Sequence, residues 1–431
     1  MLRQELRILL VKHQNRLSDA LSPSKRDDRI NGVTNAVKSA LLESSLCLSD
    51  GILSYYANGV YVGVRTAEVE NILYNLLCEL GVPSIEANRV VPLALPVVMD
   101  RHKESNPQLI AFRNCVYDLS CGGVYDFDKS LMTTYRVGYD YDAMATAPVW
   151  ESFLEQVLPC TEDHLCLQEF VGMIYVDRQK ISIEKCLLMI GEGANGKSVV
   201  YNVISSLVGR EYISTLTPTQ LRDSKQLTAL RGMKLNYCSE VKPQDAFSAS
   251  LKALVSGEKV AAWDLYRGVS EIIAPPIIFT MNRYPQTEDM SHGFFRRILP
   301  LRFGVTIPPS RQDKTLASRI IDTELSGIFN WAIEGRARLL RQRGEFTQNP
   351  YKDAEIETIR TISAPAVRYM EDNGYMPFPQ CKGQQPTFIR VSDLCEILGL
   401  NPRILARQLE GFRQVRKDTR CYVCYSKNNI S

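Results

Sequence analysis

Apolar residues recur at helical spacing over residues 2–21 and again over residues 67–80. Apolar positions three or four residues apart line one face of a helix, so both stretches are predicted to be helical. Residues 55–64 are instead rich in aromatic and β-branched residues on both sides of Asn58-Gly59. This dipeptide favours a tight two-residue turn, and the segment is therefore predicted to form a β-hairpin.

The hydrophobic pattern divides the chain into three zones. The first, residues 1–147, mixes helices with strand-like runs and predicts an α+β domain. In the second, residues 148–343, helices alternate with short buried strands, which indicates an α/β layer architecture. A polar stretch with Pro and Gly, residues 343–352, predicts a linker before a C-terminal domain over residues 353–431.

The C-terminal domain contains a helix-turn-helix pattern over residues 390–409. Gly399 is expected to end the first helix, and Asn401 to cap the second, with Pro402 at its first position. Strand-like residues follow, as in the wing of a winged helix. Winged helices bind DNA in some proteins and other proteins in others, so the pattern leaves both roles open.

Composition limits the class of protein. Of 431 residues, 45% are hydrophobic and 23% are charged, as in a soluble globular protein. No stretch approaches the roughly 18 apolar residues of a membrane span. The twelve cysteines are scattered and several lie in apolar runs, which favours a reducing compartment. We therefore expect a cytoplasmic protein with no membrane partner. The net charge of +3 means that any nucleic-acid surface must be local.

A phosphate-binding pattern, G-x-x-x-x-G-K-[ST], lies between an apolar run (186–190) and a helix-compatible run (199–207). A strand–loop–helix unit leaves backbone N–H groups free at the helix N-terminus, where they can surround phosphate oxygens. Lys197 would reach the β- and γ-phosphates, and the Ser198 hydroxyl would bind Mg²⁺. We expect the nucleotide-binding residues to be Gly191, Glu192, Gly193, Ala194, Asn195, Gly196, Lys197 and Ser198.

Three further positions follow this loop in order. Glu240 comes after a strand-like run and could hold Mg²⁺ through water or polarise the attacking water. Asn282 ends the next run and could position that water. Arg296 and Arg297 precede another apolar strand, and an arginine here could stabilise charge on the transferred phosphoryl group of a neighbouring subunit. Taken alone, each of these residues has an ordinary structural explanation. Their order along the chain, after the phosphate-binding pattern and on successive strands, supports a shared role in nucleotide hydrolysis.

This series, G-E-G-A-N-G-K-S, N-Y-C-S-E, P-P-I-I-F-T-M-N-R-Y-P and F-F-R-R-I-L-P-L-R-F, resembles the superfamily 3 helicases, which are AAA+ ATPases. The G-x-N-G-K-S loop is similar to that of phage, plasmid and poxvirus primase-helicases, and the resemblance covers residues 50–345. It implies an ATP-driven DNA helicase that uses Mg²⁺ and forms a ring, usually hexameric, around a single strand. It also implies that Lys197 and Ser198 bind phosphate and Mg²⁺, with Glu240 as the Walker B acid. Asn282 would then be the sensor, and Arg296 or Arg297 the finger.

In helicases of this type a hairpin between the second and third strands grips DNA. Here residues 254–276 read as two extended runs around a turn, with Tyr266 and Arg267 at the tip and Lys259 at the base. The cations would contact phosphate and the aromatic ring could stack on a base. In the C-terminal domain, the second helix offers DNA a basic face with Arg403 and Arg407.

The resulting hypothesis is a replicative DNA helicase of a phage, plasmid or other mobile element, acting on single-stranded and forked DNA as a homo-oligomer. The N-terminal zone carries no convincing acidic primase motif, so a separate primase or polymerase is an expected partner. Residues 1–45 would form a collar that holds the ring together or a docking segment. The protein would act in the cytoplasm of a bacterial host or a virus-infected cell. Two alternatives remain: an origin-binding initiator or loader, and a DNA packaging or transposition ATPase.

Overall fold

The computed structural model describes all residues except 24, 243–248, 265–267, 288, 290, 378–386, 410, 411, 413, 418, 419 and 428–431. The chain forms two compact units, Met1–Ala143 and Met144–Ser431, and each is described here by itself. Within the described residues, no helix is both long enough and apolar enough to cross a membrane.

The first unit combines a helical core with small sheets. The stretch predicted as one helix over residues 2–21 is two helices that meet at His13. The unit's helices are α1 (Leu2–Lys12), α2 (Gln14–Leu21), α3 (Arg26–Glu43), α4 (Thr66–Glu79), α5 (Ser84–Ala94) and α6 (Pro96–Met99). One sheet has the order β3-β2-β1-β4 and a second β5-β6-β7. The strands are β1 (Cys47–Ser49), β2 (Ile52–Ala57), β3 (Val60–Gly63), β4 (His102–Lys103), β5 (Leu109–Ala111), β6 (Val116–Asp118) and β7 (Val124–Tyr125).

The predicted hairpin is confirmed. Strands β2 and β3 pair antiparallel, with Ala57 opposite Val60. Asn58 and Gly59, which connect them, both have positive φ angles of 51° and 87°. Positive φ at both central positions is the geometry of the turn that matches the twist of a hairpin, and Asn-Gly adopts it at little cost.

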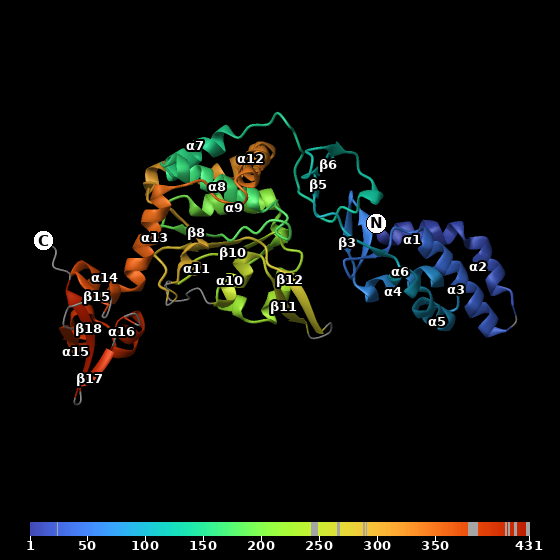
Figure 1. Ribbon diagram of the computed structural model, residues 1–431. Helices are drawn as coiled ribbons and strands as arrows, with labels where there is room; N and C mark the ends of the chain where they lie inside the picture. The colour runs from blue at the N-terminus through green and yellow to red at the C-terminus, as the bar shows by residue number, and fades with distance from the viewer. Residues whose placement is uncertain are drawn as a thin grey trace. The chain divides into compact units, whose positions relative to one another are not determined.

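The second unit is built on a parallel sheet of five strands in the order β14-β8-β13-β10-β9. Its central strands are fully buried apolar runs, as expected for a sheet covered on both faces. Figure 1 shows helices α7, α8, α9 and α12 on one side of it, and α10 with the β11–β12 hairpin on the other. The strands are β8 (Cys186–Ile190), β9 (Ile213–Ser214), β10 (Leu235–Cys238), β11 (Lys259–Asp264), β12 (Gly268–Ile273), β13 (Ile277–Met281) and β14 (Ile298–Arg302).

Helix α12 organises the helical layer. It is the longest helix described in this unit, and its buried Glu324 accepts hydrogen bonds from the backbone N–H groups of Val149 (2.9 Å) and Trp150 (2.8 Å). A carboxylate in this position satisfies two free N–H groups at the start of α7 and favours its dipole. The helices of the layer are α7 (Pro148–Val157), α8 (Thr161–Met173), α9 (Lys197–Val208) and α12 (Leu316–Arg341), and α10 (Ala249–Ser256) and α11 (His292–Phe295) lie elsewhere on the sheet.

Helices α8 and α12 pack closely through Gly172. A Cβ atom at this position would lie 2.3 Å from the backbone nitrogen of Arg336 and 2.7 Å from the carbonyl oxygen of Ala332. Both are backbone atoms of α12, so a side chain at 172 can be accommodated only if one helix moves away from the other.

Gly172→Ala is therefore expected to destabilise the second unit by about 3 kcal/mol, the upper part of the usual range for overpacking a core. Chemical denaturation followed by circular dichroism measures the loss. Gly304→Ala is the matched control in the same unit, because a Cβ there would make only ordinary contacts with the Arg302 side chain, at 3.6 Å or more, and is expected to be neutral. Equal midpoints for the two variants would contradict the packing argument.

The stretch predicted as a linker is fastened to the helical layer. Glu169 on α8 is fully buried and accepts hydrogen bonds from Arg338 Nε (2.7 Å) and from the backbone N–H of Thr347 (2.9 Å). Asn349, also fully buried, donates to Asp163 Oδ1 at 2.6 Å. These contacts hold the connection in one conformation, so it differs from a flexible linker although its sequence is polar.

The chain continues into helix α13 (Pro350–Ser363), which packs along β14. Its Ile359 is fully buried in the same hydrophobic cluster as the strands of the sheet, and the Arg360 guanidinium lies 4.4 Å from the centre of the Phe295 ring. A helix that the sequence assigns to the C-terminal domain therefore completes the core of the sheet.

The remaining residues form a small cluster with its own core. It contains the predicted helix-turn-helix: α15 ends at Gly399 with a positive φ of 63°, and Asn401 Oδ1 accepts the backbone N–H of Ile404 at 2.9 Å to cap α16. Pro402 is the first residue of α16, as expected. The elements are α14 (Pro365–Asp372), β15 (Tyr375–Pro377), β16 (Thr387–Arg390), α15 (Val391–Leu398), α16 (Pro402–Gln408), β17 (Gln414–Lys417) and β18 (Arg420–Lys427).

Candidate nucleotide site

The phosphate-binding sequence lies between β8 and α9. The strand ends at Ile190 and the helix begins at Lys197, so the six intervening residues form the loop. Gly196 has a positive φ of 88°, and a Cβ there would lie 2.9 Å from Phe153 Cζ. A larger residue would thus be strained and would collide with α7. The loop conformation requires glycine at this position.

Asn195 holds the loop together. It is buried, and its side-chain amide donates to the backbone carbonyls of Glu192 and, at 3.1 Å, of Phe303. Its Oδ1 accepts from Lys197 Nζ at 2.9 Å. Asn195 was expected to touch nucleotide as part of the loop. Its position between Phe303 and Lys197 gives it the additional role of fixing the loop to the residue that follows β14.

Lys197 lies inside the loop. Its ammonium donates to the carbonyl oxygen of Gly191 at 2.5 Å as well as to Asn195, and the side chain is 9% exposed. Burial lowers the pKa of Lys197 from its usual value, because a charged group loses hydration there. A partly dehydrated cation surrounded by neutral oxygens is well suited to bind an anion.

Glu240 and Asn282 lie at the same edge of the sheet as the loop. Strands β8, β13 and β10 are parallel neighbours, with Ile190 opposite Met281, so the residues that follow them emerge together. Glu240 has a positive φ of 54°, which is uncommon for a residue with a side chain. Its N–H donates to Thr280 Oγ1 at 3.3 Å. Sequence reasoning did not single out Thr280, which lines the same pocket as Glu240 and Asn282.

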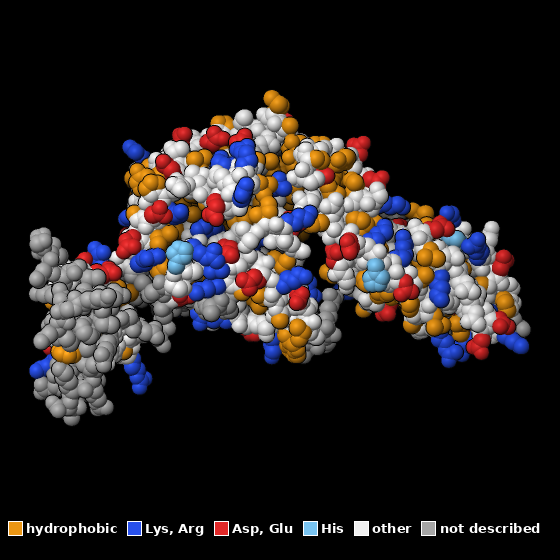
Figure 2. Space-filling view, in the orientation of Figure 1, with side chains coloured by type: hydrophobic (Ala, Val, Ile, Leu, Met, Phe, Trp, Pro, Cys, Tyr) orange, Lys and Arg blue, Asp and Glu red, His pale blue; other side chains and the backbone are white. Residues whose placement is uncertain are grey.

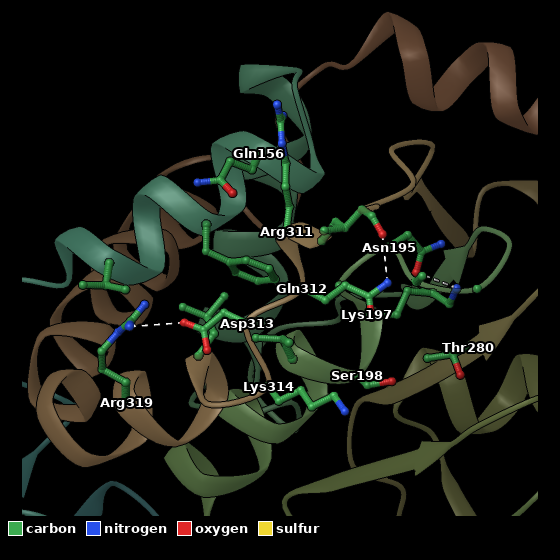
Figure 3. Close-up of a pocket in the computed structure, with 18 of the residues that line it drawn as sticks. Gln156, Asn195, Lys197, Ser198, Thr280, Arg311, Gln312, Asp313, Lys314 and Arg319 are labelled. Carbon is green, nitrogen blue, oxygen red and sulfur yellow. Dashed lines mark hydrogen bonds and ion pairs between the residues drawn. The ribbon is translucent and has the colours of Figure 1, made fainter. Parts of the chain in front are cut away.

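These strand ends, the loop and two further segments enclose a pocket of about 770 Å³. Figure 3 shows the side chains that converge on it. Eight of the residues expected to act on nucleotide line the pocket: Gly193, Ala194, Asn195, Gly196, Lys197, Ser198, Glu240 and Asn282. Sequence reasoning missed the rest of the wall, which includes Phe153 and Gln156 of α7 and Arg311, Asp313, Lys314 and Arg319 near the start of α12.

Arg296 and Arg297 do not line this pocket. They precede β14, whose first residue Ile298 lies opposite Cys186, the first residue of β8. The two arginines are therefore at the edge of the sheet away from the loop. Both pair with Glu184 Oε2, at 2.6 Å and 3.0 Å respectively.

The two arginines differ in their surroundings. Arg297 is 15% exposed and also donates to Ser256 Oγ (3.0 Å) and to the Gly293 carbonyl (2.7 Å), so its guanidinium is used within the fold. Arg296 is 48% exposed. Figure 2 shows Lys and Arg side chains gathered on the surface around α11, the short helix that precedes it. Of the pair, Arg296 is the one able to reach another molecule.

The residues expected to contact DNA are only partly described. Strands β11 and β12 form the anticipated hairpin, with Asp264 opposite Gly268, but Tyr266 and Arg267 lie outside the described residues. Lys259 at its base is exposed and lies 3.7 Å from Glu271. In the C-terminal cluster, Arg403 is exposed on α16, and the side chain of Arg407 lies outside the described residues.

The hairpin also presents a residue that the sequence did not single out. Trp263 on β11 is 37% exposed, and Lys225 Nζ lies 5.1 Å from the centre of its ring. The backbone N–H of Trp263 donates to the backbone carbonyl of Ser224 at 3.0 Å, which connects the hairpin to the segment that contains Ser224. An exposed indole beside a cation is a surface on which a nucleic-acid base can stack.

Two segments of the chain match known families. Residues 87–159 match the family described as "D5 N terminal like", and residues 189–297 match a "Family of unknown function (DUF5906)". The second segment contains the whole loop, Glu240, Asn282 and both arginines. Neither match covers half of the chain.

Two curated relatives of the chain are viral. It is 28% identical over 191 residues to "Putative helicase 121R" of Invertebrate iridescent virus 3, an alignment that covers 39% of this chain and 19% of that protein. It is 24% identical over 288 residues to "Putative helicase 184R" of Invertebrate iridescent virus 6, covering 59% and 29% respectively. The chain thus spans less than a third of the length of either relative.

Among solved structures, the A form of the apo NrS-1 C-terminal region matches 91% of this chain and 99% of that chain, with a TM-score of 0.50 at 12% identity. A second apo structure of the same region matches 90% of this chain and 97% of that one, again with a TM-score of 0.50 and 12% identity. At this identity the likeness concerns the fold, a mixed α/β architecture. The matched segments and the viral relatives together relate this chain to a D5-like primase-helicase family.

Proposed function

We propose that the protein is an ATP-dependent DNA helicase of the superfamily 3 type, built on an AAA+ core and acting in the replication of a phage, plasmid or related element. The observation that carries the proposal is the pocket, because it brings Lys197, Ser198, Glu240 and Asn282 together at one edge of a parallel sheet. Its volume is sufficient for a nucleotide. The putative helicases among its relatives support the choice of motor.

In this mechanism the loop binds the triphosphate through backbone N–H groups and Lys197. Mg²⁺, when bound, would offset the negative charge of the phosphates. Ser198 and Glu240 are the residues that would hold it, Glu240 partly through water. Oxygen donors in small number, completed by water and phosphate, are the usual environment of Mg²⁺ in such sites. Asn282 would orient the attacking water.

We further propose that the chain acts as a homo-oligomeric ring of six subunits, in which Arg296 reaches the nucleotide of a neighbour. Two observations support this: Arg296 is half exposed, and it lies at the edge of its own sheet away from the loop. The β11–β12 hairpin, with Lys259, Tyr266 and Arg267, would contact the translocated strand. A separate primase or polymerase would complete the replication machinery.

Strand displacement on a forked DNA duplex with ATP and Mg²⁺ tests this function. The full chain is expected to release the labelled strand only when hydrolysable ATP is present. Hydrolysis of ATP without strand release would instead favour a packaging or transposition motor. The absence of both nucleotide binding and hydrolysis would overturn the proposal.

The helix-turn-helix of the C-terminal cluster supports a second candidate, an origin-binding initiator or loader in which a winged helix reads DNA. The fold makes a clean test possible, because α13 belongs to the core of the sheet whereas the cluster follows it. The chain should therefore be truncated after Ala364, which keeps α13 intact.

If the cluster binds DNA backbone through Arg403 and its neighbours, truncation will weaken duplex binding and flatten its dependence on salt. Removal of two phosphate contacts lowers the slope of log affinity against log salt by about 2. Fluorescence anisotropy at several salt concentrations measures this, with ATP hydrolysis as the control for an intact core. An unchanged affinity and slope would assign the cluster to protein contacts.

A further inference from the structure

The segment from Ile307 to Arg319, here called the basic strap, runs beside the phosphate-binding loop. The Ile307 N–H donates to the carbonyl of Ala194 at 2.8 Å, and Gln312 Nε2 donates back to the Ile307 carbonyl at 2.9 Å. The first bond fixes the strap to the loop and the second closes the strap on itself. Its end leads directly into α12, so both ends are held.

The strap changes the charge of the pocket. Four cationic side chains line it, against the two carboxylates of Glu240 and Asp313. Lys197 and Glu240 balance one another, so the excess positive charge comes from the strap, which carries Arg311, Lys314 and Arg319. A Mg²⁺-bound triphosphate remains an anion, and a pocket with excess positive charge is complementary to it.

Within the strap, Asp313 acts as the structural carboxylate. It accepts hydrogen bonds from the Thr315 N–H (2.8 Å) and hydroxyl (2.7 Å), and it pairs with Arg319 at 3.2 Å. These bonds from Thr315, the largest cause, lower the pKa of Asp313, so it stays ionised at neutral pH. Arg319 is thereby engaged within the strap.

Lys314 is in a different situation. In the part of the chain that the structure describes, no carboxylate lies within ion-pair distance of its ammonium, and its side chain is exposed to the pocket. Figure 3 shows it extending towards the side of the pocket on which Ser198 lies. Asp313 and Thr315, its neighbours on both sides, fix the backbone from which it projects.

From this arrangement we infer that Lys314 is a phosphate contact, a second ammonium that the same subunit supplies to the bound triphosphate. The inference rests on the proposed function and adds to it a residue outside the motifs. The Lys314 ammonium donates to a phosphate oxygen, and Lys197 keeps its position in the loop. The nucleotide is thereby held between the loop and the strap, which makes the start of α12 part of the binding site.

Binding of a fluorescent ATP analogue with Mg²⁺ to the full chain tests this role. Lys314→Ala is expected to raise the Kd about tenfold, the effect of losing one charge-assisted contact. Its affinity should also fall less steeply with salt than that of the wild type, because one ionic contact is missing. Lys314→Arg keeps the charge and is expected to bind within about threefold of the wild type.

Lys180→Ala is the matched control, because Lys180 is a surface lysine of the same unit that does not line the pocket. If the wild type and Lys180→Ala bind nucleotide and Lys314→Ala binds equally well with the same salt dependence, the role of Lys314 is refuted while the proposed function stands. A loss that Lys314→Arg shares, with the salt dependence unchanged, also refutes the phosphate contact. If the wild type binds no nucleotide, both proposals fail.

Discussion

Lys197→Ala is expected to reduce ATP hydrolysis by at least about 10³-fold and to abolish strand displacement. The ammonium lies within hydrogen-bond distance of the loop's own carbonyl of Gly191 and of Asn195. A cation placed where phosphate charge develops, in a site that partly excludes water, commonly contributes about 4 kcal/mol to the transition state. Steady-state hydrolysis with saturating Mg²⁺ and single-stranded DNA measures the loss.

Asn195→Ala provides the graded comparison. It keeps the ammonium but removes the amide that ties the loop to the Phe303 carbonyl, so hydrolysis is expected to fall by a smaller factor, about tenfold. Circular dichroism should show both variants folded. Hydrolysis by Lys197→Ala within tenfold of the wild type would exclude the loop as the catalytic site.

Arg296→Ala and Arg297→Ala are expected to have different effects, the first on ATP hydrolysis and the second on stability. Arg296→Ala should fold normally and lose about 10³-fold in hydrolysis, the usual effect of removing an arginine that acts on a neighbour's nucleotide. Arg297→Ala should lower the stability of the unit by about 2 kcal/mol, since it leaves the buried Ser256 hydroxyl and the Gly293 carbonyl without their donor, although Glu184 keeps Arg296 as a partner. Thermal unfolding and the hydrolysis rate, both measured for each variant, distinguish the loss of stability from the loss of activity.

Mixing provides a sharper test of action between subunits. Lys197→Ala and Arg296→Ala are each expected to be inactive alone. When they are mixed and assembled at random, roughly a quarter of the interfaces join an intact Lys197 to an intact Arg296, and hydrolysis should return in proportion. A mixture as inactive as its components would show that Arg296 does not act across an interface.

The sequence predicted the turns and helix ends that depend on the residues at those positions alone. Asn58-Gly59 turns a hairpin because both residues tolerate positive φ, and Gly399, Asn401 and Pro402 delimit two helices. These choices depend on the conformational preferences of single residues. They could therefore be read without knowledge of the fold.

The rest of the candidate site could not be read in this way. Lys314 lies in a polar stretch with no motif, and contacts distant in the chain, such as the hydrogen bond from Ile307 to Ala194, place that stretch beside the loop. Likewise the polar connection to α13 looks like a linker until its partners, Glu169 and Asp163, are seen on α8. Contacts between residues far apart in the chain decide both cases, and hydrophobic periodicity carries no information about them.

Helix α12 has a mechanical consequence. It spans 26 residues, about 39 Å, and its first turn is the end of the strap, which lines the nucleotide pocket. Its far end leads to the connection held by Glu169, from which α13 departs. Because the backbones of α8 and α12 lie against each other at Gly172, we expect the two helices to move as one body. We therefore expect any displacement of the strap to move α12 and α8 together, and with them the connection to α13 that Glu169 and Asn349 hold.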